Sequence, residues 1–361
     1  MKIALVYDRV NKWGGAERVL LALHEMFPEA PLYTAVYSSK KANWAKIFPE
    51  IILSFLQKIP LMQDKHEFLG TFMPIAFESF DFKDFDWVIS VTSEAAKGII
   101  TGPKTRHLCY MLTPTRYLWS AYHLYFQNPV LRFISQPAVN YLKKWDLGAA
   151  RRPDKIIAIS TAVQKRIKKY YRLDSKVIFP PVNIPPITSH QPLPIKRNDY
   201  FLVVSRLTPY KRVDLAIQAF NKLGFPLYII GTGNQEARLR RMAKPNIKFL
   251  GEMGNKKLSY YYEHGQALIY PQEEDFGITA VEAQAHGMPV IAYKAGGALD
   301  TVIDGVTGVF FSRQEVDSLV ASVAQFNRAG FNRSRLVKNA KRFSKARFKK
   351  GFKKIVYGDF K

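Results

Sequence analysis

The chain has 361 residues, of which 47% are hydrophobic, 23% are charged and one is cysteine. This composition excludes a wholly disordered chain, and the single cysteine excludes a framework of intrachain disulfides. The length exceeds what one hydrophobic core usually serves, so we expect two domains. A formal net charge of +25 predicts an anionic partner, either lipid or nucleic acid, although a solvated basic face that aids solubility would carry the same charge.

The first residues form a short strand-like run that meets Asp8 and Arg9 too early for the apolar core of a signal peptide. No later apolar stretch approaches the roughly 18–20 residues that a membrane-spanning helix needs. We therefore expect no export signal and no spanning helix. Cys109 lies in the apolar run 107–112, where a small buried thiol is expected, and a reducing compartment fits.

Short β-branched runs alternate with helix-period segments along the chain, which predicts an α/β fold with parallel sheets. The expected strands, in chain order, are 2–7, 86–91, 107–112, 155–159, 201–205, 227–230, 247–250, 267–270 and 289–292. The clearest expected helices are 16–26, 213–222 and 278–286. Residues 40–85 and 113–150 are aromatic and irregular, and such insertions usually carry partner recognition.

The densest proline run of the chain lies between residues 180 and 194. We expect it to be extended, because proline fixes φ and lacks an N–H donor, and we interpret it as a linker. The predicted domains are therefore residues 1–185 and 186–335. Residues 336–361 are predicted to belong to a basic C-terminal helix. Its phenylalanines would pack inward, and these are Phe343, Phe348 and Phe352.

In open parallel sheets the ligand crevice lies beyond the carboxyl ends of the strands. The first loop to follow a strand contains Gly14 and Gly15, which let the backbone approach a ligand before a helix whose N–H groups suit an anion. A plain turn would show the same glycine pair. A second loop, after strand 201–205, carries Arg206 and Lys211, which could both reach a diphosphate. A generic surface loop of a basic protein would look similar.

A third loop joins a strand to a helix and places Glu274 and Glu282 at its two ends. Gly277 permits a tight turn, and the backbone amides of Gly277, Ile278 and Thr279 would face a ligand. Carboxylates suit sugar and ribose hydroxyls, while helix amides suit a diphosphate. The loop therefore offers polar groups to both halves of a nucleotide sugar, although two surface glutamates at an ordinary helix start would have the same spacing.

Several further motifs occur in order along the second half of the chain. They are Ile230-Gly231-Thr232-Gly233-Asn234, Phe249-Leu250-Gly251-Glu252, Gly296-Gly297 and Gly305-Val306-Thr307-Gly308. With the Arg206 loop and the Glu274 loop, they make residues 201–311 resemble the nucleotide-binding domain of the retaining family-4 glycosyltransferases. The N-terminal half is also similar, through runs 14–17, 113–117 and 159–182, so the resemblance covers nearly the full chain.

This family has the GT-B fold, in which two Rossmann-like, doubly wound parallel-sheet domains face each other across a cleft. The resemblance implies that Glu274 contacts the donor sugar while Arg206 and Lys211 neutralise the diphosphate leaving group, which makes these three the expected catalytic residues. Glu282 would hold the ribose. The other expected binding residues are Gly14, Gly15, Gly231, Gly233, Glu252, Phe276, Gly277, Ile278 and Thr279. The reaction would retain anomeric configuration, mainly by electrostatic stabilisation and without metal or cofactor.

The pattern is most similar to mannosyltransferases of surface-polysaccharide assembly, so we expect mannose transfer from GDP-mannose to a lipid-linked or polysaccharide acceptor held by the N-terminal domain. A UDP-sugar donor is the alternative. Two basic clusters, within residues 143–172 and 333–354, predict attachment to anionic lipid at the cytoplasmic face of the membrane. The C-terminal helix would cross back onto the N-terminal domain, as it does in related proteins.

One residue departs from the related pattern. Members with a similar Cys-Tyr-x-x-Thr-Pro run often have histidine immediately before Thr-Pro, where this chain has Leu112. A first-domain catalytic histidine is therefore not carried over to this chain, and the departure is compatible with an altered donor preference or with a weak or inactive enzyme.

The sequence fits several other functions less well. Asp84-Phe85-Asp86 matches a metal-binding Asp-x-Asp, but Asp86 leads directly into a strand, so a strand-start role is expected. A dinucleotide-binding oxidoreductase fits less well, because position 236 is Glu where G-x-G-x-x-G needs glycine. A sugar-nucleotide epimerase of the same fold is an alternative, but it would not need the basic clusters. A non-catalytic membrane- or RNA-binding protein would use the same positive charge, but no recognisable nucleic-acid motif is present.

Overall fold

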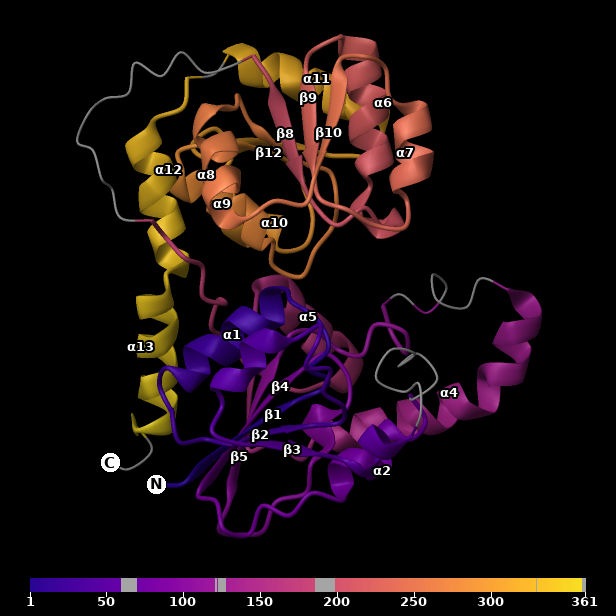
Figure 1. The fold of residues 1–361 in the computed structure, drawn as a ribbon, viewed down its shortest axis with the longest axis vertical. Helices are drawn as coiled ribbons and strands as arrows, with labels where there is room; N and C mark the ends of the chain where they lie inside the picture. Colours follow the sequence, from indigo (N-terminus) through magenta and orange to yellow (C-terminus); the bar gives the residue numbers. More distant parts are fainter. Residues whose placement is uncertain (60–69, 121, 123–127, 186–198, 329, 359–361) are drawn as a thin grey trace. The chain divides into compact units, whose positions relative to one another are not determined.

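The structure is a computed structural model that describes residues 1–59, 70–120, 122, 128–185, 199–328 and 330–358 (Figure 1). The chain divides into two compact units. The first contains Met1–Pro180 and Phe348–Lys361, and the second contains Pro181–Arg347. Residues 186–198, which include most of the proline-rich run predicted as a linker, lie outside the described residues.

The first unit is built on a seven-stranded sheet with the order β3-β2-β1-β4-β5-β6-β7. Its strands are β1 Ile3–Tyr7, β2 Leu32–Thr34, β3 Ile51–Leu53, β4 Trp87–Thr92, β5 Arg106–Met111, β6 Lys155–Ala158 and β7 Lys176–Val177. Every neighbouring pair is parallel, and Leu5 of β1 lies between Leu32 of β2 and Ile89 of β4. The central strands are buried on both faces, which explains their continuous apolar sequences.

Helices of the first unit cover this sheet and also occupy parts of the two segments that the sequence predicts to be irregular. The helices are α1 Gly15–His24, η1 Asn43–Ile47, η2 Phe55–Lys58, α2 Met73–Glu78, η4 Ala96–Gly98, α4 Pro129–Ala149 and α5 Thr161–Tyr171. The prediction was wrong for 113–150, because the 21-residue helix α4 occupies its second half and accommodates Pro137 in its interior. The aromatic and proline content of that segment obscured its helical period.

The second unit contains a six-stranded parallel sheet with the order β10-β9-β8-β11-β12-β13. Its strands are β8 Phe201–Val204, β9 Leu227–Ile230, β10 Ile247–Gly251, β11 Leu268–Tyr270, β12 Val290–Tyr293 and β13 Gly308–Phe311. Side chains alternate between two cores: Phe201 and Val203 join one hydrophobic cluster, and Leu202 joins the other. Each face of the sheet is therefore sealed by its own layer of helices.

The helices of the second unit fall into these two layers. They are η5 Pro209–Lys211, α6 Val213–Leu223, α7 Glu236–Met242, α8 Asn255–His264, α9 Ile278–Ala285, α10 Ala298–Thr301, α11 Val316–Arg328, α12 Arg333–Ala340 and η6 Lys341–Phe343. Apolar residues of α6, α7 and α11 belong to one cluster, and those of α8, α9 and α10 belong to the other. Both units thus have the helix-covered parallel sheet that the alternating sequence pattern predicts.

The basic C-terminal segment is two helices and not the single helix that the sequence predicts. Helix α12 packs on α9 of the second unit, and helix α13, Lys345–Val356, follows a break at η6. Phe348 and Phe352 of α13 pack against Tyr110 of β5, with ring centroids 5.8 and 5.4 Å apart. Both phenylalanines and Phe343 are buried, which confirms their predicted packing role. No helix within the described ranges is long and apolar enough to cross a membrane.

Candidate active site

The central feature of the second unit is an ion pair between loops that follow two adjacent strands. Lys211 ends the 3₁₀ turn η5 after β8, and Glu274 lies in the loop after β11. Because β8 and β11 are neighbours in the sheet, these loops emerge side by side, and Lys211 Nζ pairs with Glu274 Oε1. The fold therefore brings together two predicted catalytic residues that are 63 positions apart in the sequence.

Gln272 supports this ion pair. Its Nε2 donates a 3.2 Å hydrogen bond to Glu274 Oε1, the same oxygen that meets Lys211. Gln272 is buried, while the side chains of Lys211 and Glu274 are 12% and 19% exposed. The charges are thus partly shielded from water, which strengthens their electrostatic effect on a ligand.

The start of α9 places backbone N–H groups beside the same loop. Gly277 has φ of 92°, a left-handed conformation that favours glycine, and a Cβ there would lie 2.6 Å from Tyr270 Oη. In the part of the chain that the structure describes, the amides of Gly277, Ile278 and Thr279 have no hydrogen-bond acceptor. The positive end of the helix dipole therefore faces outward with unused donors, which suits an anionic group.

Gly296 and Gly297 fix the shape of the Glu274 loop. Gly297 N donates a 2.8 Å hydrogen bond to Glu274 O, and a Cβ on Gly296 would come within 2.3 Å of that oxygen. A Cβ on Gly297 would meet Phe276 Cα at 2.3 Å. Phe276 is buried and its ring lies 5.4 Å from that of Phe343. The predicted binding residue Phe276 thus anchors the loop by packing into the interior of the unit.

Gly231 and Gly233 let the loops after β8 and β9 pack together. Gly231 has φ of 127°, and its Cβ would lie 2.0 Å from Ser205 O. A Cβ on Gly233 would lie 2.4 Å from Leu207 O. Both positions therefore require glycine for the packing of these loops, independently of any ligand.

The remaining predicted residues of this unit lie around the pair. Arg206 is exposed, and its Nη2 donates a 2.8 Å hydrogen bond to Tyr210 Oη, so the structure does not join it to Glu274. Glu252 is exposed just after β10. Glu282 projects from α9, where its Oε2 accepts a 3.4 Å hydrogen bond from Tyr262 Oη.

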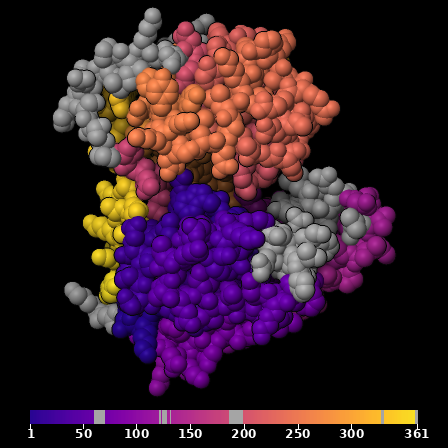
Figure 2. Space-filling model, viewed as in Figure 1, coloured from indigo at the N-terminus to yellow at the C-terminus, as the bar shows by residue number. Residues whose placement is uncertain are grey.

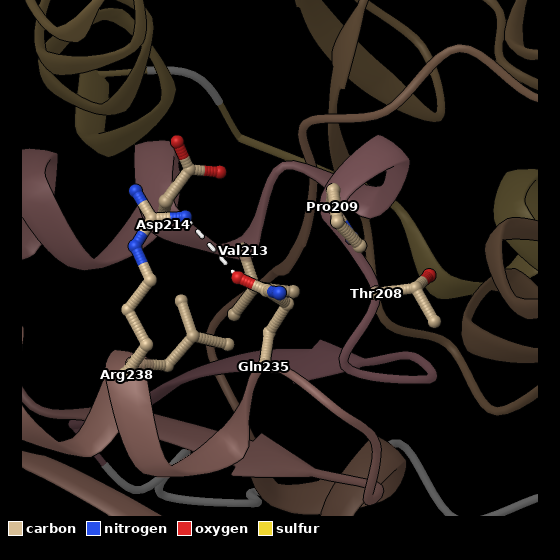
Figure 3. Close-up of a pocket in the computed structure, with 7 residues that line it drawn as sticks. Thr208, Pro209, Val213, Asp214, Gln235 and Arg238 are labelled. Carbon is tan, nitrogen blue, oxygen red and sulfur yellow. Dashed lines mark hydrogen bonds between the residues drawn. The ribbon is translucent and has the colours of Figure 1, made fainter. Parts of the chain in front are cut away.

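A small pocket of about 160 Å³ adjoins η5 (Figure 3). It is lined by Thr208, Pro209, Val213, Asp214, Gln235, Arg238 and Leu239. Figure 3 shows Arg238 turned toward Gln235, to which it donates a 3.1 Å hydrogen bond. None of the predicted site residues lines this pocket, and its volume is below the roughly 300 Å³ of typical ligand sites.

The first unit has its own charged groups at the carboxyl ends of its strands. Gly14 and Gly15 stand at the start of α1, and the extended φ of −177° at Gly14 is one that any residue adopts. After β1, Arg9 forms a partly buried ion pair with Glu94, which follows β4. Burial raises the pKa of the Glu94 carboxyl, against the opposing effect of the Arg9 charge.

Asp8 organises the segment that carries Glu94. Its two carboxylate oxygens accept hydrogen bonds from Thr92 Oγ1 and from the backbone amides of residues 93–96, at 2.7 to 3.1 Å. The site residues predicted from the sequence do not include Asp8, Arg9, Glu94 or Gln272. The rule that ligands bind beyond strand carboxyl ends would have found all four, because each follows a strand.

The Asp-x-Asp motif of residues 84–86 immediately precedes a strand. Asp86 Oδ2 accepts a 2.7 Å hydrogen bond from Lys2 N directly before β4, as expected for a strand-start role. Within the described ranges, no group of three or more His, Cys, Asp or Glu side chains could hold a metal ion.

Comparison with protein-family models matches residues 187–343 to the family of glycosyl transferases group 1. The matched segment contains Lys211, Glu274 and the start of α9. Residues 187–343 therefore resemble a group 1 glycosyltransferase domain. The matched segment makes up most of the second unit and contains every predicted site residue of that unit.

The chain is 28% identical over 217 residues to an uncharacterized glycosyltransferase of Methanocaldococcus jannaschii, a match that covers 58% of this chain and 59% of that protein. It is also 34% identical over 131 residues to the GDP-mannose-dependent monoacylated alpha-(1-6)-phosphatidylinositol monomannoside mannosyltransferase of Corynebacterium glutamicum. That match covers 32% of this chain and 34% of the mannosyltransferase. The similarity to these curated relatives thus spans less than two thirds of their lengths.

Two solved structures are similar along nearly the whole chain. The Anabaena protein HepE, in complex with UDP, has a TM-score of 0.72 at 19% identity and covers 99% of this chain and 100% of its own. The lipopolysaccharide outer core galactosyltransferase WaaB has a TM-score of 0.70 at 18% identity, with the same coverage. At such identity the likeness shows the fold, and it confirms the predicted GT-B class with two Rossmann-like parallel-sheet domains.

Proposed function

We propose that the chain is a retaining, metal-independent hexosyltransferase that uses a nucleotide diphosphate sugar and a lipid-linked or polysaccharide acceptor. The observation that carries this proposal is the Lys211–Glu274 ion pair beside the unused amides of α9. An ammonium and helix amides suit a diphosphate, and a carboxylate suits sugar hydroxyls. One loop cluster therefore serves both parts of a donor.

The reaction needs stabilisation of the leaving group more than it needs a nucleophile. As the bond from the anomeric carbon to the phosphate oxygen breaks, negative charge grows on the diphosphate. Lys211, Arg206 and the α9 amides would stabilise this charge. Each such donor is worth about 3 kcal/mol of transition-state stabilisation. The departing phosphate oxygen takes the proton of the acceptor hydroxyl, whose oxygen bonds to the carbon on the same face. Anomeric configuration is thereby retained.

GDP-mannose is the proposed donor. In support, the chain is 34% identical over 131 residues to a GDP-mannose-dependent mannosyltransferase. A UDP-hexose is the alternative, since HepE, a protein of the same fold, has been solved with UDP and with UDP-glucose.

The proposed location is the cytoplasmic face of the membrane, where the enzyme would be peripheral and its first unit would bind the acceptor. Lys165, Lys168 and Lys169 of α5 are exposed and add to a net charge of +25. Basic residues near an anionic bilayer contribute about 1 kcal/mol each to attachment. This charge would concentrate the enzyme where lipid-linked acceptors lie.

Thermal unfolding with GDP, UDP, GDP-mannose, UDP-glucose and UDP-N-acetylglucosamine tests the site, because a ligand that binds only the native state raises the Tm. We expect a shift with guanine nucleotides that Lys211→Met and Glu274→Gln weaken. Lys222→Met is the matched control, since Lys222 pairs with Asp317 on the surface of the same unit. The absence of a shift with every nucleotide would overturn the transferase proposal and favour a non-catalytic binding protein. Proton NMR of the product would test retention, and activity in excess chelator would test metal independence.

A further inference from the structure

Helix α4 of the first unit presents an apolar stripe on its surface. The stripe consists of Val130, Phe133, Ile134, Pro137 and Tyr141, which recur at helical spacing and lie on one face. Phe133 is 84% exposed, and Val130, Ile134 and Tyr141 are 64%, 67% and 49% exposed. Single exposed apolar residues are common, but a continuous stripe of large ones marks an interaction surface.

The other face of α4 holds the helix in place. Val139 and Leu142 are buried in a cluster with Leu118, and the buried Asp146 pairs with Lys97. These contacts lie in the C-terminal half of the helix. The N-terminal half extends beyond the sheet of its unit in Figure 1, and Figure 2 shows α4 in magenta on the surface. The stripe is therefore carried on a rigidly anchored element.

The dimensions of the stripe suit the surface of a bilayer. At about 1.5 Å per residue, the stripe from Val130 to Tyr141 is about 16 Å long. This length is roughly half the thickness of the hydrocarbon core of a bilayer. Arg132, Lys143 and Lys144 lie on the same helix. A helix of this kind lies in the plane of the interface with its apolar face embedded.

The surrounding charge favours an anionic partner. The acidic residue of α4 is Asp146, which is buried and already paired, so the exposed charges of the helix are basic. Lys143 Nζ lies 5.7 Å from the Trp119 ring, and Trp119 stacks on Tyr170 of α5 at 5.5 Å. Tryptophan and tyrosine next to lysine are typical of the headgroup level of membranes.

We propose that the stripe inserts into an anionic lipid bilayer at the boundary between headgroups and acyl chains, while Lys143 and Lys144 contact the headgroups. Lipid fits better than a second copy of this chain, because two copies of such a basic face would repel each other. This inference rests on the membrane attachment proposed above, but it requires neither the donor nor the transfer reaction.

Co-sedimentation with vesicles tests the stripe. The variant Phe133→Ser/Ile134→Ser is compared with Ile47→Ser/Ile100→Ser, which removes two apolar residues of the same unit that are 50% and 54% exposed. On vesicles of phosphatidylcholine with phosphatidylglycerol, we expect the first variant to bind roughly tenfold more weakly than the native protein and the second to bind normally. Equal binding by both variants, at matched Tm, would overturn the proposal.

A label at the stripe separates insertion from surface adsorption. Cys109 is buried, so an environment-sensitive fluorophore can be attached selectively to Phe133→Cys or, as the control, to Ile47→Cys. Insertion predicts that brominated acyl chains quench the label at 133 but not at 47. Absence of quenching at 133 would overturn insertion. Insertion would also be overturned if the native protein dimerised without vesicles and the variant Phe133→Ser/Ile134→Ser did not.

Transfer to a water-soluble acceptor, measured without vesicles, separates this inference from the proposed function. We expect Phe133→Ser/Ile134→Ser to retain native transfer while it loses vesicle binding. If the native protein shows no transfer but the label at 133 is quenched, the proposed function is wrong and the proposed insertion of the stripe is supported.

Discussion

Lys97 Nζ lies 2.6 Å from Asp146 Oδ1, and both side chains are only 1% exposed. Asp146 also accepts hydrogen bonds of 2.7 Å from Thr115 Oγ1, Trp119 Nε1 and Tyr171 Oη. This carboxylate therefore ties α4 and α5 to the loop that follows β5. Through these contacts the C-terminal half of α4, the proposed membrane helix, is held to the loops that follow the strands of the first unit.

Replacing Lys97 should destabilise the protein severely. Lys97→Met leaves the Asp146 charge buried without its cation, so we expect the free energy of unfolding in urea to fall by about 3 kcal/mol or more. Lys168→Met removes an exposed ion pair with Asp174 and should cost less than about 1 kcal/mol. Similar losses in the two variants would contradict the role assigned to the buried pair.

Substitutions at Lys211 and Glu274 of the candidate active site should slow catalysis. Lys211→Met and Glu274→Gln should each lower kcat/KM roughly 100-fold or more, because each removes a group that acts on developing charge or orients the donor. The double variant should lose less than the product of the two effects, since the two side chains form one ion pair. Lys222→Met should keep native rates. Rates within a few-fold of native in all the variants would refute the assignment.

Gly231 should tolerate no side chain. A Cβ would meet Ser205 O at 2.0 Å in a backbone with φ of 127°, so Gly231→Ala should lower the free energy of unfolding by about 2 kcal/mol or more. Gly254→Ala is the control, because its Cβ would meet nothing within 4 Å and its φ is −71°. Urea unfolding of both variants decides the matter, and equal stability would show that the two loops can separate without cost.

Stability should depend on pH through His107. Burial, with a smaller effect of the Arg152 charge, lowers the pKa of His107 to about 3, below an unfolded value of about 6.5. The unfolded chain therefore binds the proton first, so this contribution to stability is complete above about pH 6.5 and is lost as the pH falls toward 3. At pH 5 the loss should be about 2 kcal/mol.

The matched variant is His107→Gln, which cannot titrate in this range but can keep a hydrogen bond to Ser90, whose Oγ lies 2.8 Å from His107 Nε2. Urea unfolding at pH 5 and pH 7.5 should show a smaller difference in the variant than in the native protein. An unchanged difference would assign the acid sensitivity to other groups.

Local pattern was sufficient for much of the fold. The long apolar runs of β1, β4 and β8 were predicted because strands buried on both faces need continuous hydrophobic sequence. The two-residue strand β7 and the three-residue strands β2 and β3 were missed, since such short segments are defined by their partners in the sheet. Helix α4 was missed because Pro137 and many aromatic residues masked its period.

The sequence by itself determined the class of the protein: alternating strands and helices, a basic charge, and polar residues after strands that resemble those of a glycosyltransferase. Only the tertiary structure decided that Lys211 meets Glu274, that Arg206 turns to Tyr210, and that the face of α4 with Phe133 is the uncovered one. The reason is physical. Periodicity records whether a residue prefers burial, but which residue it meets depends on the order of strands in the sheet and on the surfaces left uncovered after the core is filled.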